Sequence, residues 1–341
     1  MPKSSPKPPW ILGVDAGGTH TRAVLATMDG RVRGLGFADG ANFQGCGVRT
    51  AQKQIESAIQ AAMKAGRIGK AQVACAAYGI SGADREKDFD TVAEFLAPVN
   101  PAERFVLSND TTLALRAGTH DGVGVACIAG TGSNTMGFNA AGDHIKVGGF
   151  GGYSGDYGSS FNLTKKAVVA AMKEWDGRGP KTLLTPLLCE ALGVEEICDI
   201  IEYEFWDNHR PLPLNKYTPL LFDAANAGDK MALKILRETG RQCGDDALSC
   251  LRRLFPNRSE AVHVVLGGSI YQKGSNPTMV DTLTARVKRF YPNAVITRLH
   301  DEPVTGALLL AADLCAGKTA PKKLQTALRR GVAELVSKRK V

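Results

Sequence analysis

The stretch VDAGGTHTR, residues 14–22, begins as an apolar strand, turns at two glycines and then presents the polar side chains of Thr19, His20, Thr21 and Arg22. Glycine tolerates positive φ and allows close backbone approach, so successive N–H groups of such a turn can point at one anion. The hydroxyls of Thr19 and Thr21 add further donors. The stretch therefore predicts an anion-binding turn between two strands.

A second stretch repeats this pattern about a hundred residues later. Residues 122–150 show the same apolar run, glycine-and-hydroxyl turn and second turn as residues 10–37, so both segments are predicted to be three-stranded meanders. Repetition of this kind indicates one folding unit used twice. A third glycine turn, Gly267–Ser269, follows the apolar run HVVLG.

Short apolar strands alternate with helical segments after each meander. This order predicts an α/β protein with two similar domains, each a mixed sheet flanked by helices, facing each other across a cleft. The Pro- and Lys-rich residues 1–10 are expected to be a disordered leader and not a signal peptide. We expect an N-terminal domain over 11–118, a C-terminal domain over 119–316, and a basic amphipathic helix over 317–341 that docks on the N-terminal domain.

The net charge of +8 does not indicate a nucleic-acid-binding protein. Residues 318–341 hold eight Lys or Arg and one Glu, and the leader holds two Lys, so the body of the chain is close to −1. The eight cysteines form no C-x-x-C pair, which favours reduced thiols over a metal site or disulfides. No apolar segment is long enough to cross a bilayer. A cytoplasmic protein without nucleic-acid or membrane partners is expected.

The glycine turns match neither standard phosphate motif. G-x-x-x-x-G-K-[ST] and G-x-G-x-x-G are both absent, and so is the hydrolase elbow G-x-S-x-G. One such turn alone is most often an ordinary hairpin. Three of them in a repeated context favour binding of a polyphosphate.

Two carboxylates close predicted strands. Asp15 stands two residues before Gly17, where a carboxylate would repel phosphate unless it holds Mg²⁺, directly or through water. Asp110 ends the strand RFVLSND and could accept a proton from an attacking hydroxyl. It could equally be the N-cap of the helix that follows.

The glycine-rich segment VGGFGGYSGDYGSS, residues 147–160, is the third signal. Its glycines would let the backbone approach a small ligand while Asp156 accepts hydrogen bonds from ligand hydroxyls. The alternative is a surface loop in which Asp156 caps the next helix. Asn42, in the loop after the first meander, could bind a polyol in the same way.

These motifs together, in this order, resemble the N-acetylglucosamine kinase branch of the actin-like sugar-kinase superfamily, also described as the BadF/BadG/BcrA/BcrD ATPase family. The residues that carry the resemblance are DAGGT, SND, AGTGSN, GGFGGYSGDYGS, LGGSI and PVTGALLLA. The resemblance covers about residues 11–315 and implies two actin-like (ribonuclease H-like) domains. It implies an ATP-dependent sugar kinase that phosphorylates the 6-hydroxyl of N-acetyl-D-glucosamine, with glucosamine or N-acetylmuramic acid as alternative acceptors.

The resemblance also implies a role for each motif. Asp110 would be the general base, and Asp15 would organise Mg²⁺. The residues implied to bind ATP are Gly17, Gly18, Thr19, Gly130, Thr131, Gly132, Ser133, Gly267, Gly268 and Ser269. The residues implied to line the sugar pocket are Asn42, Ser133, Asn134, Gly149, Phe150, Gly151, Gly152 and Asp156.

The chain departs from the family at two places in the sugar loop. The usual pattern is G-G-W-G…G-D-E-G-S, whereas Phe150 replaces the tryptophan and Tyr157 the glutamate. A different class also remains open, because some relatives are ATPases that activate a reductase or dehydratase. Those relatives carry clustered cysteines for an iron–sulfur centre, and the dispersed cysteines here count against this function. The sequence leaves open whether the protein forms a homodimer.

Overall fold

The computed structural model describes residues 8–69, 72–205 and 213–338, which form two compact units. The first unit runs to Val123 and resumes at Leu299, and the second spans Gly124–Arg298. Residues 1–7 of the predicted leader lie outside the described residues, whereas Trp10 already begins the first strand.

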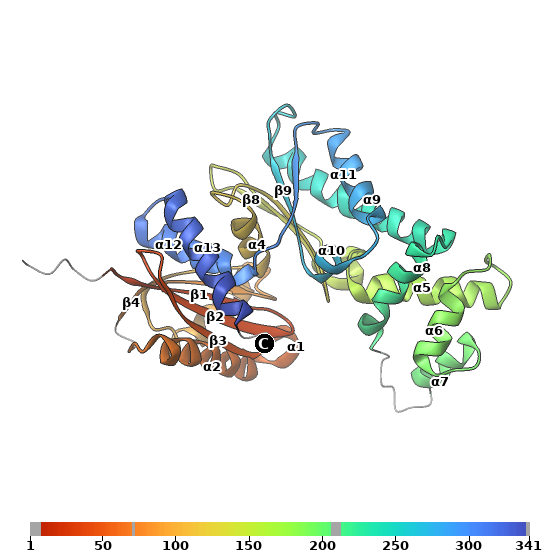
Figure 1. Cartoon of the computed structure of the whole chain (residues 1–341), viewed down its shortest axis with the longest axis horizontal. Coiled ribbons are helices and arrows are strands. Elements are labelled where there is room, and N and C mark those ends of the chain that lie inside the picture. The colour runs from red at the N-terminus through yellow and green to blue at the C-terminus, as the bar shows by residue number, and fades with distance from the viewer. Residues whose placement is uncertain (1–7, 70–71, 206–212, 339–341) are drawn as a thin grey trace, which may run out of the picture. The chain divides into compact units, whose positions relative to one another are not determined.

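The first unit is built on a five-stranded mixed sheet with the order β3-β2-β1-β4-β5 (Figure 1). β1, β2 and β3 pair as antiparallel neighbours, and β4 and β5 run parallel to β1. The predicted meander is confirmed, since the tight turns at Gly17–Thr19 and Asp29–Gly30 allow only antiparallel pairing. The strands are β1 (Trp10–Ala16), β2 (His20–Thr27), β3 (Val32–Asp39), β4 (Val73–Ile80) and β5 (Ala102–Ser108).

Helices cover both faces of this sheet (Figure 1). On one face α2 and α3 pack over Leu12 and Val14, and on the other α12 and α13 pack over Ile11. Successive side chains of a strand point to opposite faces, so the continuous apolar run of β1 contributes to both cores. The helices are α1 (Phe43–Cys46), α2 (Val48–Gly66), α3 (Glu86–Leu96), α4 (Asp110–Gly118), α12 (Pro303–Ala316) and α13 (Lys322–Ser337).

Two glycines let α12 pack very closely in the first unit. A Cβ on Gly13 would lie 2.4 Å from the backbone nitrogen of Leu308, and one on Gly306 would lie 1.9 Å from the carbonyl oxygen of Leu113 in α4. A larger residue at either position would force the backbones apart. The first turns of α4 and α12 are thereby held at the carboxyl ends of the parallel strands.

The boundary that the sequence analysis drew at residue 316 is wrong. Residues 299–316, assigned there to the second domain, belong to the first unit, as do Thr119–Val123. The reason is that the apolar side chains of α12 complete the core of the first sheet, which also buries Leu328 and Val336 of α13. Helical periodicity alone does not tell which sheet an apolar helix will cover.

The second unit repeats the topology of the first, with the strand order β10-β9-β6-β7-β8. β6, β7 and β8 form the antiparallel meander, while β9 and β10 continue the sheet in parallel. The predicted duplication of one α/β unit is thus confirmed. The strands are β6 (Gly124–Ala129), β7 (Ser133–Phe138), β8 (His144–Val147), β9 (His263–Gly267) and β10 (Val295–Arg298).

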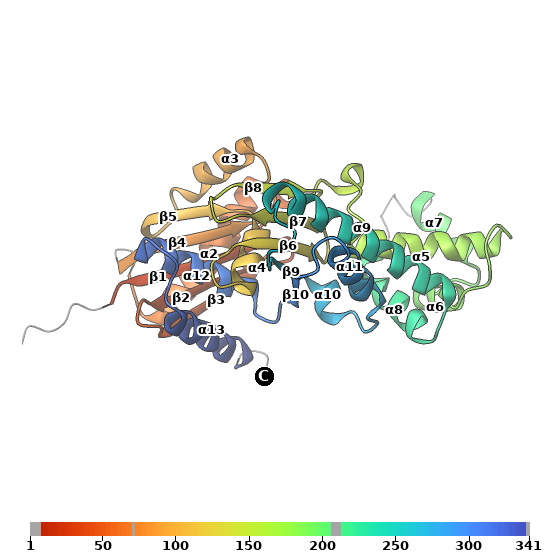
Figure 2. The ribbon, with the colours of Figure 1, turned by 90° about the horizontal axis from the view of Figure 1, so that it is seen from above.

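The long helix α9 crosses the meander of this second sheet, and α11 packs along α9 (Figure 2). The remaining helices follow β8 or β9 in the chain. In the described residues no helix has both the length and the apolar character needed to span a membrane. The helices are α5 (Ser160–Trp175), α6 (Leu184–Leu192), α7 (Ile200–Phe205), α8 (Thr218–Asn226), α9 (Lys230–Leu254), α10 (Ser269–Lys273) and α11 (Thr278–Lys288), with 3₁₀ turns at Gly151–Ser154, Ile197–Asp199 and Leu214–Tyr217.

Candidate functional site

The predicted anion turn of the first unit joins β1 to β2. The N–H of Gly17 donates to the carbonyl of His20 at 3.0 Å, and the carbonyl of Gly17 accepts from Ala41 at 2.9 Å. Gly18 and Thr19 are exposed, and a Cβ on Gly18 would meet no atom within 4 Å. The turn is therefore anchored at Gly17 and presents its tip to solvent, as an anion-binding turn requires.

Asp15 lies at the carboxyl end of β1, beside the ends of the two parallel strands. It pairs in register with Gly79 of β4, which in turn pairs with Ser108 of β5. Asp15 is 7% exposed. Burial, and next the charge of Asp110, raise the pKa of Asp15 to about 7. The two candidate carboxylates therefore lie at one edge of the sheet and act on each other electrostatically.

Asp110 is not the N-cap of α4, so that alternative is wrong. The cap is Asn109, whose side-chain oxygen accepts the N–H of Thr111 at 3.0 Å. The Asn109 amide also donates to the carbonyl of Ala83 at 3.2 Å and to Asp84 at 2.8 Å. Asp110 is the first helical residue and is half-buried. Its carboxylate is therefore not needed for capping.

Two residues that the sequence analysis did not identify complete this charged group. Arg22 of β2 stands opposite Asp15 in register, and its Nη1 is 3.8 Å from Asp15 Oδ2. The same nitrogen is 3.6 Å from Oε2 of Glu302, the residue before α12. The hairpin register could have identified Arg22. Nothing in the sequence links Glu302 to Asp15, because they meet only when α12 packs on the first sheet.

Asn42 has a local structural role. Its side-chain oxygen caps α1 by accepting the N–H of Gln44 at 3.1 Å, and its amide lies 3.5 Å from the Ser81 hydroxyl. Ser81 follows β4, so Asn42 lies near the same sheet edge as Asp15 and Asp110. The structure brings these three predicted residues to one end of the first unit.

In the second unit the glycine turns after β6 and β9 lie side by side. The N–H of Gly130 donates to Gly132 at 2.9 Å, and the carbonyl of Gly130 accepts from Ser160 at 2.7 Å. Gly268 has φ of +92°, and a Cβ there would lie 2.3 Å from the carbonyl oxygen of Ala129. Ser269 is close to Gly130, because a Cβ on Gly130 would be 3.7 Å from the Ser269 nitrogen.

A cavity of about 310 Å³ opens beside these two turns. Thr131 from one turn and Ser269 from the other line it, together with Thr218 and Phe222 of α8 and Lys273 of α10. Its volume lies at the lower end of the range for small-molecule sites. The predicted residues Gly130–Ser133 and Gly267–Ser269 thus adjoin a pocket with apolar, hydroxyl and cationic walls.

Asp156 is not the cap of α5, which is Ser159. Its carboxylate instead holds its own loop: it accepts the N–H groups of Gly149 at 2.8 Å and Gly151 at 2.6 Å, and the Ser154 hydroxyl at 2.6 Å. The segment is therefore an exposed loop, as the surface-loop alternative predicted, and the half-buried Asp156 carboxylate holds it in place. Gly152 lies in its 3₁₀ turn.

The two unusual aromatic residues of this loop each stack on a lysine. Phe150 is 51% exposed, and the Lys146 ammonium lies 4.4 Å from its ring centre. The Lys166 ammonium lies 4.9 Å from the ring centre of Tyr157. Such contacts hold the rings in place without burying them.

Ser133 and Asn134, at the start of β7, lie against this loop. A Cβ on Gly158 would be 3.1 Å from the Ser133 hydroxyl oxygen, and one on Gly149 would be 2.7 Å from the Asn134 side-chain oxygen. The structure therefore brings the glycine turn after β6, Ser133, Asn134 and the glycine-rich loop into one group within the second unit.

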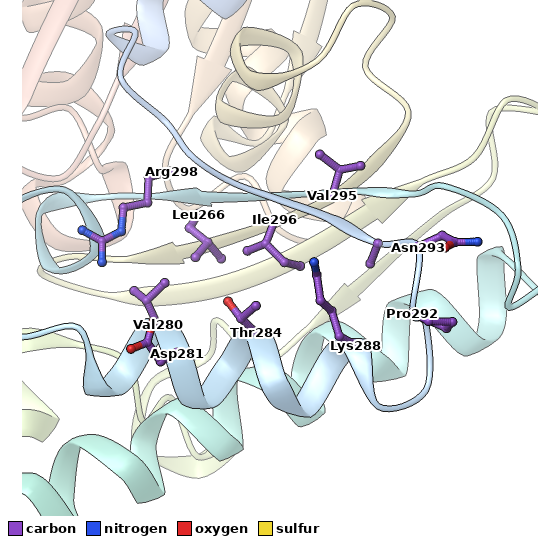
Figure 3. Close-up of a pocket in the computed structure, with 11 residues that line it drawn as sticks. Leu266, Val280, Asp281, Thr284, Lys288, Pro292, Asn293, Val295, Ile296 and Arg298 are labelled. Atoms are coloured by element: carbon purple, nitrogen blue, oxygen red, sulfur yellow. The ribbon is translucent and has the colours of Figure 1, made fainter.

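A larger cavity of about 610 Å³ lies elsewhere in the second unit. Figure 3 shows Val280, Thr284 and Lys288 of α11 facing Leu266 and Ile296 of the sheet. None of the residues predicted from the sequence lines it. Although this cavity is larger, the glycine turns that could bind an anion do not line it. The smaller cavity beside Thr131 and Ser269 is therefore the better candidate for the functional pocket.

The described residues contain no cluster of three His, Cys, Asp or Glu side chains able to hold a metal by themselves. Mg²⁺ usually keeps several waters and binds one or two carboxylates plus substrate phosphates. Asp15, buried next to an exposed glycine turn, is a suitable carboxylate for such a partial site.

Comparison with known proteins gives a consistent set of relatives. The model of the BadF/BadG/BcrA/BcrD ATPase family matches residues 12–311. The chain is 29% identical over 317 residues to an N-acetyl-D-glucosamine kinase of Dictyostelium discoideum, with 88% of this chain and 97% of that protein covered. It is 25% identical over 308 residues to an N-acetylmuramic acid/N-acetylglucosamine kinase of Clostridium acetobutylicum, with 90% and 99% covered.

A solved structure supports the fold in the same way. A Chromobacterium violaceum protein classed as an N-acetylglucosamine kinase matches with a TM-score of 0.68 at 24% identity. The match covers 90% of this chain and 100% of that one. At this identity the likeness establishes the two-unit architecture.

Proposed function

The chain belongs to the BadF/BadG/BcrA/BcrD ATPase family, as its motifs predicted, and we propose that it is an ATP-dependent amino-sugar kinase. Its acceptor is the 6-hydroxyl of N-acetyl-D-glucosamine. The family membership and the two kinase relatives support the reaction class. The acceptor rests on the printed activities of those relatives and on the glycine-rich loop.

The position of Asp110 carries this proposal. Asn109, and not Asp110, caps α4, and Asp110 begins that helix directly after β5, at the edge where the parallel strands β1, β4 and β5 end. Ligands of α/β proteins bind at the carboxyl ends of parallel strands. Asp110 accepts the proton of the sugar hydroxyl as that oxygen attacks the γ-phosphorus, and ADP leaves with the bridging oxygen.

The exposed backbone N–H groups of Gly18 and Thr19, and of Thr131 and Gly132, bind the phosphates of ATP. They stabilise charge on the transferring phosphoryl group because they are already oriented before the reaction. Mg²⁺, when bound, would offset the negative charge of the ATP phosphates. Asp15 is the residue that would hold it, through water.

The cavity of about 310 Å³ beside Ser269 accommodates the adenosine. Phe222 offers an apolar face to the base, and Lys273 lies at the same pocket. Asn134 and the loop held by Asp156 bind the sugar. Because Asp156 already accepts three hydrogen bonds from its loop, it shapes the sugar pocket as well as offering oxygens to sugar hydroxyls.

Two alternatives follow from the residues. Phe150 and Tyr157 replace the family tryptophan and glutamate, so glucosamine or N-acetylmuramic acid is the alternative acceptor. The other class is an ATPase that activates a reductase or dehydratase through an iron–sulfur centre. In the described residues Cys75 lies beside Cys315, and Cys127 lies near Cys243 and Cys250. Most of these thiols are buried, whereas an iron–sulfur centre shared at a dimer interface needs exposed cysteines, and this disfavours such a centre. A brown protein with bound iron would support that class.

An ADP-release assay with a panel of acceptors tests the proposal. The panel holds N-acetylglucosamine, glucosamine, N-acetylmuramic acid, glucose and a sugar-free control. We expect sugar-dependent ADP release with N-acetylglucosamine as the best acceptor, and a loss in kcat of about 100- to 10,000-fold in Asp110→Asn. Asp90→Asn, exposed on α3, is the matched control. ADP release that no sugar stimulates would overturn the kinase proposal.

A further inference from the structure

Arg22 lies in a row of side chains that crosses the first sheet. It pairs in register with Asp15 of β1 on one side and with Phe37 of β3 on the other. Directly paired residues point to the same face of a sheet, which here is the face covered by α12. The guanidinium of Arg22 is 5.9 Å from the ring centre of Phe37. The arginine is thus confined between an aromatic ring and a buried carboxylate.

The ion pairs of Arg22 are shared and long. Its Nη1 is 3.8 Å from Asp15 and 3.6 Å from Glu302, beyond the range of about 2.7–3.2 Å for a direct N–H···O hydrogen bond. Its Nε is buried and has no hydrogen-bond partner. An arginine that bonded Asp15 fully would take the fork geometry with two short contacts. Here the arginine instead divides its charge between two carboxylates.

Glu302 occupies the N-cap position of α12, yet its side chain makes no capping hydrogen bond. Its position is fixed, because Gly13 and Gly306 allow α12 to lie directly on β1 and α4. The helix therefore holds a carboxylate next to Arg22 that makes no capping hydrogen bond. A residue with that geometry and no capping bond is suited to an electrostatic role.

The charges of this group have a definite balance. Asp110 and Glu302 each act electrostatically on Asp15, and the cation Arg22 pairs with both Asp15 and Glu302. With all three carboxylates ionised the group carries a net charge of −2, which one divalent cation would balance. Without Glu302, Arg22 would pair with Asp15 only, and the net negative charge that attracts a cation to this group would fall from −2 to −1.

We propose that Arg22 and Glu302 are positioning residues for Asp15, in which Glu302 shares the charge of Arg22 and so keeps the Asp15 carboxylate available to the divalent cation that accompanies ATP. The inference rests on the proposed function for the presence of that cation. Arg22 orients the Asp15 carboxylate, and Glu302 prevents Arg22 from forming a short bidentate ion pair with Asp15. Neither residue touches the reacting atoms.

The test measures nucleotide binding by calorimetry, without sugar and without turnover. The probe is a non-hydrolysable ATP analogue, titrated with and without Mn²⁺, and the readout is the gain in affinity that Mn²⁺ provides. In Glu302→Gln we expect this gain to fall about tenfold, with the metal-free affinity and the melting temperature unchanged. Glu302→Asp should restore the gain, and Glu334→Gln on α13 is the exposed control.

The double variant Arg22→Gln/Glu302→Gln tests whether Glu302 acts through Arg22 or acts directly on the cation. If Glu302 acts through Arg22, the effect of Glu302→Gln should largely disappear in the Arg22→Gln background, since coupled residues are non-additive. An undiminished Mn²⁺ gain in Glu302→Gln, or an equal loss in both backgrounds, would overturn the proposal. These titrations contain no sugar, so they test the role of Glu302 independently of the acceptor. Failure of every acceptor in the kinase assay would reject the proposed function, whereas an unchanged Mn²⁺ gain in Glu302→Gln would reject only the role of Glu302.

Discussion

The side-chain oxygen of Asn109 accepts the backbone N–H of Thr111 at 3.0 Å, across the residue that lies between them. The capping bond is made by the neighbour of Asp110, so the helix end is satisfied without the catalytic candidate. The Asn109 amide is tied in turn to Ala83 and Asp84 in the segment after β4. The first turn of α4, which carries Asp110, is therefore held by a residue that makes no contact with substrate in the proposed reaction.

Asn109→Ala should lower both stability and turnover. Loss of the cap costs about 1 kcal/mol, and loss of the bonds to Ala83 and Asp84 releases the first turn of α4. We expect a lower melting temperature and a reduced kcat with a nearly unchanged KM for ATP. Asn109→Ser, which keeps a capping oxygen and adds no charge beside Asp84, should retain more stability than the alanine variant. A normal kcat in Asn109→Ala would show that Asp110 is positioned by other contacts.

The buried ion pair between Arg116 and Asp313 should be essential to the first unit. Arg116 is fully buried, and its Nε and Nη2 donate to Asp313 at 2.7 and 3.1 Å. Asp313→Leu would leave a buried guanidinium uncompensated, at a cost of about 3–5 kcal/mol. Urea denaturation measures this loss, and the double variant Arg116→Leu/Asp313→Leu should recover part of it.

The exposed pair of Arg31 and Asp29 is the matched comparison. Asp29→Leu should change the free energy of unfolding by about 1 kcal/mol or less, since exposed pairs contribute little. Equal losses at Asp313 and Asp29 would contradict the buried-pair argument.

Asp246 of α9 should make the second unit less stable as the pH rises through 6. Burial, and next the charge of Asp156, raise its pKa from the ordinary 3.8 to about 6. The folded state therefore favours the protonated acid, so stability is full below pH 3.8 and is lost as the pH rises through about 6. Asp246→Asn should melt a few degrees above the wild type at pH 8, and the difference should vanish near pH 4. A difference independent of pH would reject this assignment.

The features that depend on residues close together in the chain could be predicted from the sequence. The apolar runs and glycine turns of both meanders lie within single segments, so the repeated topology, the turns and Asp15 could be located directly. What failed depends on contacts between distant segments. Glu302 reaches Arg22 only because α12 crosses to the first sheet, and the same packing moved the domain boundary. The capping roles at Asn109 and Ser159 each lie one to three residues from the predicted acids, within the usual uncertainty of helix ends.

Gly268 should be the most sensitive position of the nucleotide pocket. Its φ of +92° disfavours any side chain, and a Cβ would lie 2.3 Å from the carbonyl oxygen of Ala129. Gly268→Ala must therefore push the β9–α10 turn away from β6, next to which Ser269 and Thr131 line the cavity. We expect the affinity for ATP to fall at least about tenfold, because misplacement by 1 Å can cost about 100-fold. Calorimetry with a non-hydrolysable analogue measures it.

Gly228→Ala is the control for Gly268→Ala, because it adds backbone strain without displacing the turn after β9. Gly228 also has a positive φ, of +84°, but a Cβ there would meet no atom within 4 Å. It lies between α8 and α9 and does not line the cavity beside the glycine turns. The alanine should cost stability through φ alone, about 1 kcal/mol, while ATP binding stays intact. If both variants lost stability to the same degree and bound ATP equally well, the turn after β9 would have no part in the nucleotide site.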